Sequence, residues 1–533
     1  MRNVKKLKKA VVLFMAVTCA TTIITGCDNK NLDGDERVTI DWLGYQPTAE
    51  PDRNSAIVKA LEEKYNINLD FWYIDNQKYE ELIGVKLASG DMPDVFRAPN
   101  LGTLSKYVQQ GVAAEITDEM LAMAPSYMQS IADNDTEGNT WIDAKIDGKL
   151  YAFKSQTLSG TYPTTLAWRT DWLKNVGIER IPETLDEWED AMYKFTFNDP
   201  DGNGINDTYG MSETTFSPIF GAFGAVPINR FNLSGAIDTF YTKVDGKISF
   251  ACIQPEMMEG LRLLTKWYKD GVIDPNFITG ENTGGYWAIS QAFENGRIGV
   301  TGNAVLYQWN PPLYEGNNGG AVYQSFMKVN PTAKFGETFD LGKAPMGPTG
   351  KSGTQTWGAV SNGGQILTTN ATKDQRKIDF LFQFLEDQYS DIEMATLLTY
   401  GVEGVTYKKT EEGVYSLLPE FSTPEAQIKA GINVLKVSGG GNPLFSKIWD
   451  EKIYEFSDKY KGTGYSNARA PQVPAKAKYI ADIQKYTVES YMKIITGEKP
   501  IEFFHEYVET LLTKMGGQQI IDETNAEILK SAQ

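Results

Sequence analysis

Apolar positions beyond residue 36 follow the spacing of strands and of helices in turn. Val38–Leu43 and Ile67–Ile74 are rich in β-branched and aromatic residues and predict two strands. Asn54–Lys64 and the region near Tyr79–Ala88 predict a helix after each strand, and Asp94–Arg97 predicts a short third strand. Strands that alternate with helices are typical of a mostly parallel sheet covered by helices, so we expect an α/β fold.

The sequence shows clear helix start or stop signals at two places. Thr184 and Glu187 form a capping box, and Trp188, Met192 and Phe195 then recur on one helical face. A second apolar stripe stops at a glycine, and it contains Ile480, Ile483, Thr487, Tyr491 and Ile494. We assign the helical tryptophans to the core, namely Trp172, Trp188 and Trp267.

The first residues have the pattern of an export signal. A basic stretch precedes the apolar run Ala10–Ile24, which is short for a membrane span, and the run ends in I-T-G-C at residues 24–27. This ending resembles a bacterial lipobox, in which Cys27 becomes the lipidated residue. We expect residues 1–26 to be a signal peptide and 27–36 a tether to the outer face of the cytoplasmic membrane. An ordinary signal or a membrane helix is the alternative.

The formal net charge of −18 narrows the possible partners. Nucleic acids and anionic lipids require a positive protein face, so neither is expected as a partner. Cys27 and the signal account for two of the three cysteines, which leaves Cys252 and permits no internal disulfide framework. The single histidine, His505, lies on a helical stretch and is interpreted as structural or solvated.

Residues 199–207 form the clearest chemical motif of the chain. Side-chain oxygens occur at loop positions 1, 3 and 5, a glycine occurs at 6, a backbone carbonyl is available at 7, and a further carboxylate occurs at 9. This alternation suits Ca²⁺, which binds six or more oxygen atoms. The predicted ligands are Asp199, Asp201, Asn203, Ile205 and Asp207.

The loop departs from an EF-hand at position 12, where Gly210 replaces the usual glutamate. The site must therefore close differently, for instance through both oxygens of Asp207. A generic turn is the alternative, because Asp, Asn, Gly and Pro are common in turns. We predict a structural calcium ion.

Several segments together resemble family 1 extracellular solute-binding proteins, particularly the LplA/LipO-type lipoproteins of carbohydrate ABC importers in Gram-positive bacteria. The segments occur in order along the chain and are S-G-D-M-P-D-V (89–95), D-G-K-L-Y-A-F (147–153), W-R-T-D-W-L-K-N-V-G (168–177), P-E-T-L-D-E-W (182–188), W-Y-K-D-G-V-I-D-P-N-F (267–277), E-N-G-R-I-G-V (294–300), Y-G-V-E-G-V-T-Y (400–407) and I-I-T-G-E-K-P (494–500).

The resemblance implies a type 2 periplasmic-binding fold, with two α/β lobes, hinge strands and a ligand cleft between the lobes. By analogy the chain crosses between lobes near Phe153–Thr157 and again near Thr354–Ser361. Lobe one would combine residues 36–155 and 357–410, and lobe two residues 156–356 and 411–533. The function implied is a monomeric, lipid-anchored receptor that captures an oligosaccharide by lobe closure and delivers it to ABC permease subunits.

A sugar cleft needs aromatic platforms for the C–H faces of the rings and planar polar groups for the hydroxyls. The best candidates follow predicted strands or lie in glycine-rich loops. They are Tyr45, Gln46, Arg97, Asn100, Asn303, Tyr307, Trp309, Trp357 and Glu403.

Other functions remain open at this point. A secreted polysaccharide-active enzyme would need a carboxylate pair, and the abundant acidic residues allow one. However, the chain has no G-x-S-x-G, H-E-x-x-H or P-loop motif, so we expect no enzyme. A receptor for another solute, such as a peptide, and a sensory partner of a membrane kinase are the further alternatives.

Overall fold

The computed structural model describes most of the chain from residue 37 onward. The described residues are 37–44, 49–74, 79–98, 101–135, 140–155, 162–229, 231, 239–279, 291–302, 304–314, 317–356, 363–410, 413–437, 442–449 and 451–531.

A four-stranded sheet organises the first part of the fold. Its order is β12-β3-β1-β2, where β1 (Val38–Leu43) lies parallel to β2 (Ile67–Trp72) and β3 (Val95–Ala98). Strand β12 (Gly364–Leu367) returns from far along the chain and pairs antiparallel with β3. The sheet is therefore mostly parallel, as the alternating pattern predicts, and the first three strands match their predicted positions closely.

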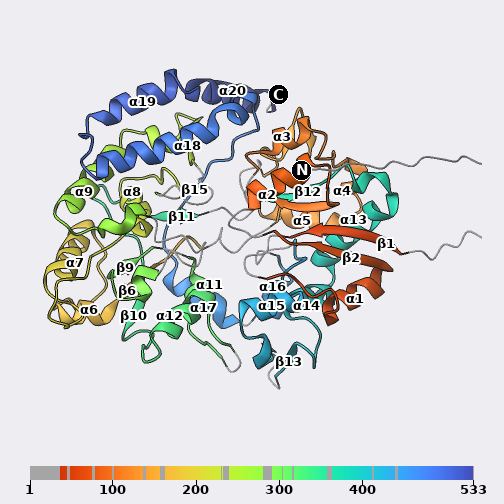
Figure 1. The fold of residues 1–533 in the computed structure, drawn as a ribbon, viewed down its shortest axis with the longest axis horizontal. Coiled ribbons are helices and arrows are strands. Elements are labelled where there is room, and N and C mark those ends of the chain that lie inside the picture. The colour runs from red at the N-terminus through yellow and green to blue at the C-terminus, as the bar shows by residue number, and fades with distance from the viewer. Residues whose placement is uncertain are drawn as a thin grey trace, which may run out of the picture. The chain divides into compact units, whose positions relative to one another are not determined.

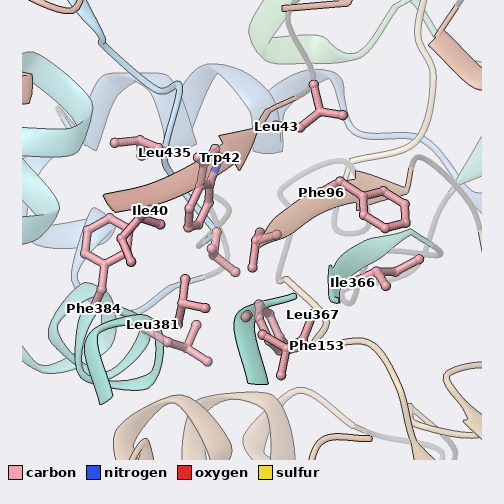
Figure 2. Close-up of a cluster of buried hydrophobic side chains, with 14 of the residues drawn as sticks. Ile40, Trp42, Leu43, Phe96, Phe153, Ile366, Leu367, Leu381, Phe384 and Leu435 are labelled. Carbon is pink, nitrogen blue, oxygen red and sulfur yellow. The ribbon is translucent and has the colours of Figure 1, made fainter. Parts of the chain in front are cut away.

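Helices cover this sheet and enclose the first hydrophobic core (Figure 1). We call the sheet, these helices and their core lobe one. Figure 2 shows Trp42 and Ile40 of β1 near Phe384 and Leu381 of α13. The remaining elements of this part are α1 (Ala56–Tyr65), α2 (Tyr79–Ala88), α3 (Leu104–Gln109), α4 (Asp118–Leu121), α5 (Pro125–Asp133), β4 (Lys145–Ile146), β5 (Lys149–Leu150), α13 (Gln375–Ser390), α14 (Ile392–Tyr400), β13 (Tyr407–Lys409), β14 (Tyr415–Leu417), α15 (Pro424–Ala430) and α16 (Phe445–Ile448).

The first core extends past the boundary at residue 410 that the resemblance suggests. Ile428, Ile432 and Leu435 are buried in it, and Figure 2 places Leu435 beside the β1 side chains. A hydrogen bond also holds the segment of residues 428–437 in place, because the Val437 amide donates to the Gln388 side chain on α13 at 2.8 Å. Residues 428–437 therefore belong with lobe one.

A second and a third core share a smaller antiparallel sheet, and we call this part lobe two. Its order is β10-β6-β9. The elements are β6 (Leu166–Arg169), α6 (Thr170–Asn175), α7 (Leu185–Phe197), α8 (Phe216–Gly221), β7 (Tyr241–Val244), β8 (Lys247–Phe250), α9 (Met257–Lys269), α10 (Gln291–Glu294), β9 (Val300–Thr301), α11 (Leu306–Trp309), α12 (Ala321–Val329), β10 (Phe339–Gly342), β11 (Thr354–Thr356), α17 (Glu451–Tyr460), β15 (Gly464–Ser466), α18 (Pro474–Ile495), α19 (Phe503–Thr513) and α20 (Gly517–Ser531).

The second core confirms two predictions about helices, namely the buried tryptophans and the capping box. Trp172, Trp188 and Trp267 have no exposed surface, and the capping box of Thr184 and Glu187 is formed at the start of α7. Cys252 is also fully buried here, where its carbonyl accepts from the Tyr491 hydroxyl at 2.7 Å. Burial raises the pKa of its thiol to about 11.

Backbone hydrogen bonds join the chain segments that flank the two predicted crossings between the lobes. Phe153 and Gln365 exchange backbone hydrogen bonds of 3.0 and 2.9 Å in lobe one, and the Thr164 amide donates to the Gln355 carbonyl at 2.9 Å in lobe two. The outgoing and returning chains are therefore paired at both ends of the crossing. Residues 156–161 and 357–362, between these pairs, lie outside the described residues. Among the residues that the structure covers, no helix has the length and apolar character needed to span a bilayer.

Candidate functional site

The structure describes four of the nine residues predicted to contact a ligand. Arg97, Tyr307, Trp309 and Glu403 can be located, and the remaining predictions fall outside the described residues, as does the predicted lipidation site. Those positions are Cys27, Tyr45, Gln46, Asn100, Asn303 and Trp357.

Arg97 lies near the end of β3 and is half-buried. Its backbone pairs with Gln365 of β12, and its carbonyl accepts from the Tyr79 hydroxyl of α2 at 2.6 Å. Residue 97 is thus held from two sides at the carboxyl end of a central strand, where ligand crevices form in α/β sheets.

Trp309 is a core residue in this structure. Its indole has no exposed surface and packs against the rings of Phe293 and Phe339, each with a centroid 6.0 Å away. An enclosed ring offers no face to a sugar, so its assignment as a stacking platform needs correction. Tyr307 is half-buried on the same short helix and packs on the same cluster.

Glu403 is exposed in the turn between α14 and β13. Its backbone forms an isolated β-bridge with Tyr407. Burial is the main cause that raises the pKa of the Tyr407 phenol, and the negative charge of Glu403 is the second cause.

A buried polar cluster beside the first crossing was not predicted from the sequence. The Lys154 ammonium group lies 2.8 Å from a carboxylate oxygen of Asp143, and Arg469 approaches the same oxygen at 3.5 Å. Gln472 donates to the Asp143 carbonyl at 3.0 Å. These partners are 11 and more than 320 positions apart, so no local motif could have revealed them.

The cluster joins segments that pack in different cores. Asp143 and Lys154 flank Ala144, Ala152 and Phe153 of the first core, whereas Arg469 and Gln472 flank Ala470 of the second. We call Asp143, Lys154, Arg469 and Gln472 the hinge cluster. It adds a noncovalent connection next to the chain crossing.

Burial dominates the electrostatics of the hinge cluster. Lys154 is fully buried, and the loss of hydration lowers its pKa to about 8, although the Asp143 carboxylate opposes the shift. Nearby Arg469 lowers this pKa further. The lysine therefore stays protonated at neutral pH mainly because Asp143 is beside it.

The predicted metal loop forms a compact turn whose oxygens converge on its own backbone. Asp199 accepts from the amides of Asn203 and Gly204, both at 3.0 Å, and the Ile205 amide donates to the Asn203 side chain at 2.7 Å. The Asn203 side-chain nitrogen lies 2.9 Å from Asp201 and 3.2 Å from Asp207. A partially positive amide group thus lies between two carboxylates.

Crowded carboxylates make this loop self-repelling. Partial burial is the largest cause that raises the pKa of Asp201, and the charges of Asp207 and Asp199 add to it. No group of three or more acidic, His or Cys side chains among the described residues is arranged as a formed metal site. The donor set is nevertheless oxygen-only and would need only rotation of the Asn203 amide to present another oxygen.

The structure explains why position 12 of the loop is glycine. Gly210 packs against α7, and a Cβ atom there would lie 2.8 Å from the Met192 Cβ. Thr208 also donates to the Phe195 carbonyl at 2.7 Å, and the Gly210 amide donates to Thr196 at 3.1 Å. The loop exit is bound to the helix, which leaves no space for a glutamate ligand.

Comparisons with known proteins agree with this architecture. The family described as bacterial extracellular solute-binding protein matches residues 50–247. Lipoprotein LipO of Bacillus subtilis (strain 168) is 22% identical and aligns with 96% of this chain and 97% of its own length. The polygalacturonan/rhamnogalacturonan-binding protein YtcQ of the same strain is 24% identical, with coverage of 97% and 98%.

The solved structures show the same fold. The S. pneumoniae ABC-transporter substrate-binding protein FusA, in complex with kestose, superposes with a TM-score of 0.67 at 16% identity. The match covers 93% of this chain and 100% of the FusA chain. YtcQ and FusA are both named as binding proteins. Residues 50–247 of this chain thus match the family of bacterial extracellular solute-binding proteins, and the chain has the fold of solved substrate-binding proteins.

Proposed function

We propose that this protein is the lipid-anchored receptor of an ABC importer and that it captures an oligosaccharide by lobe closure. The observation that carries the proposal is the pair of lobes with separate cores, joined by paired chain crossings. A ligand that contacts both lobes stabilises the closed arrangement by its additional contacts, and an importer can recognise that arrangement.

The relatives support the ligand class that we propose. YtcQ is named for binding two pectic polysaccharides, and FusA was solved with kestose, a sugar oligomer. These matches span nearly the full length of both chains, so they include the parts of the fold that contact ligand. An oligosaccharide is therefore the ligand class that we assign to this chain.

Binding to defined sugars tests the proposal. Calorimetry and thermal unfolding of the chain from residue 28 onward should be measured with pectic, fructan and neutral plant oligosaccharides. At a hundredfold excess over Kd, a bound sugar should add about 2.7 kcal/mol of stability and raise the melting temperature. Absence of binding to every sugar, together with binding of a peptide from a mixed library, would contradict the proposal.

Lipidation at Cys27 is part of the proposal. The I-T-G-C sequence supports it, and the name of LipO states that this relative is a lipoprotein. Mass spectrometry of the membrane fraction should find a diacylglyceryl-modified Cys27 at the new amino end. The Cys27→Ser variant should lose the modification and leave the membrane, whereas Cys252→Ser should not.

An enzymatic role can be separated from binding by product analysis. The solute-binding proteins to which the chain is similar support binding without turnover. We expect oligosaccharides to be recovered intact after prolonged incubation with the protein. Accumulation of shortened or unsaturated products would favour the polysaccharide-active alternative.

A structural Ca²⁺ ion in the loop at residues 199–207 completes the proposal. Asp199, Asp201 and Asp207 would supply carboxylate oxygens, Asn203 an amide oxygen and Ile205 a carbonyl oxygen. The crowding of carboxylates around Asn203 supports this assignment. FusA has also been solved as an EF-hand mutant, which indicates that this structural neighbour has such a motif. The ion would fix the connection between α7 and the strand-like segment at Tyr209–Met211.

A further inference from the structure

A pocket of about 570 Å³ lies on lobe two, where helices α9 and α18 end. Its volume is within the range of small-molecule sites, roughly 300–1,000 Å³. None of the four predicted ligand contacts that the structure describes lines it. The polar and aromatic residues that do so are Tyr209, Thr265, Tyr268, Lys269 and Thr496.

Two half-buried phenol rings that line the pocket have partners on other elements. The Arg297 guanidinium lies 5.5 Å from the centre of the Tyr209 ring, and Phe277 meets the Tyr268 ring edge to face at 5.6 Å. Arg297 is itself fixed by an ion pair with buried Asp274 at 2.7 Å. Rings that are ordered before binding lose little conformational entropy when a ligand stacks on them.

Backbone and hydroxyl groups complete a surface suited to sugar hydroxyls. Gly271 and Gly497 both have positive φ angles, and a Cβ atom at either position would meet no other atom within 4 Å. These two turns therefore leave open space beside the backbone. The Thr265 hydroxyl lies within donating distance of the Leu261 carbonyl at 2.7 Å and the Ile494 carbonyl at 3.1 Å, and its oxygen can still accept a hydrogen bond.

The charge of the pocket differs from that of the whole chain. Lys269 lines it and is exposed, and no carboxylate is present among the described lining residues, although the chain carries a net charge of −18. An acidic or neutral sugar can therefore approach without the repulsion that the rest of the surface imposes.

We propose that this pocket is an auxiliary saccharide site on lobe two, which holds a distal part of a long glycan chain. The inference rests on the proposed oligosaccharide function. Because both sites would hold the same chain, binding at the second site becomes intramolecular and increases the affinity for polymers without a change in affinity for short sugars.

Chain length tests the inference. Kd should be measured for a short and a long oligomer of the bound sugar, by calorimetry, and for the polymer by retention in an affinity gel. Tyr268→Ala and Lys269→Ala should weaken binding of the long chains by about tenfold and leave the short oligomer unaffected. Lys514→Ala, which removes an exposed lysine outside the pocket, is the matched control.

The possible outcomes separate the two proposals. Equal affinity of the parent for long and short chains, or unchanged polymer retention in both variants, overturns the auxiliary site while the receptor function stands. A parent protein that binds no saccharide of any length overturns both. A loss of short-oligomer binding in Tyr268→Ala, with unchanged thermal stability, would place the pocket in the primary site and also contradict the inference.

Discussion

The hinge cluster and the metal loop handle negative charge in opposite ways. At Asp143 the carboxylate is buried, and the chain supplies Lys154 from 11 positions away and Arg469 from a distant segment. At residues 199–207 three carboxylates gather in an exposed turn, where the nearest compensation is an amide group of Asn203. The first site has its counter-charges within the protein, whereas the second would gain them from the calcium ion that we propose.

This difference indicates what each site responds to. A buried ion pair is sensitive to the loss of either partner and to pH, because the remaining charge has no water to solvate it. An exposed carboxylate cluster is sensitive to divalent cations and to ionic strength. The following predictions test this contrast, in order of decreasing effect.

Removal of the buried carboxylate should have the largest effect. Asp143→Ala leaves the Lys154 ammonium group buried without its nearest counter-charge, so it should cost about 3–5 kcal/mol in the free energy of unfolding. Urea denaturation followed by tryptophan fluorescence measures it. Asp482→Asn, at an exposed position, should change stability by less than about 0.5 kcal/mol. Equal losses of unfolding free energy in the two variants would show that Asp143 does not stabilise the buried Lys154 ammonium group.

The pH dependence of stability should reveal Lys154. Its folded pKa of about 8 lies below the unfolded value of 10.5, so the unfolded chain binds more protons between these two values. Stability therefore rises with pH across this window, by up to roughly 3 kcal/mol, and the burial penalty is fully present below pH 8. The Lys154→Met variant should lack this rise. Parallel pH profiles of parent and variant would show that Lys154 does not titrate there.

Calcium should stabilise the protein through the loop alone. Addition of Ca²⁺ at a hundredfold excess over its Kd should add about 2.7 kcal/mol, and chelation should reverse the gain. Asp201→Asn should abolish the response, because it removes a ligand oxygen charge. Asp482→Asn should retain it. A calcium response that survives in Asp201→Asn would place the ion elsewhere.

Substitution at Gly210 should have the smallest effect. Gly210→Ala forces a methyl group against Met192 and should cost about 1–3 kcal/mol. Gly210→Glu should be no better a calcium binder than the parent, because its side chain has no path to the loop. Titration with Ca²⁺, monitored by calorimetry, checks the second point, and tighter binding in Gly210→Glu would refute it.

Local patterns in the sequence predicted the local structure well. The run at Val38–Leu43 is confirmed as a strand, and the run at Ile67–Ile74 forms a strand that ends at Trp72. The capping box at Thr184 marks the start of α7 as expected. These features depend on neighbours a few positions apart. The two-lobe fold is confirmed as well, although the sequence patterns alone indicated only the α/β class and the resemblance supplied the lobes.

Features that depend on distant partners could not be read from the sequence. Asp143 and Arg469 meet only in the folded chain, so neither stood out among the many charged residues. Trp309 follows a glycine-rich strand end, which favours a surface role, yet the rings of Phe293 and Phe339 enclose it. The boundary at residue 410 failed for the same reason, because Leu435 returns to the first core from far along the chain.

The buried thiol of Cys252 gives a practical route to observing motion in this protein. A raised pKa and full burial make it unreactive toward maleimides, and it is the sole cysteine of the described residues. Dye pairs can therefore be attached to cysteines introduced on the surface, one in each lobe, without removal of the native residue. Single-molecule fluorescence would then test whether a ligand drives the lobe closure that we propose.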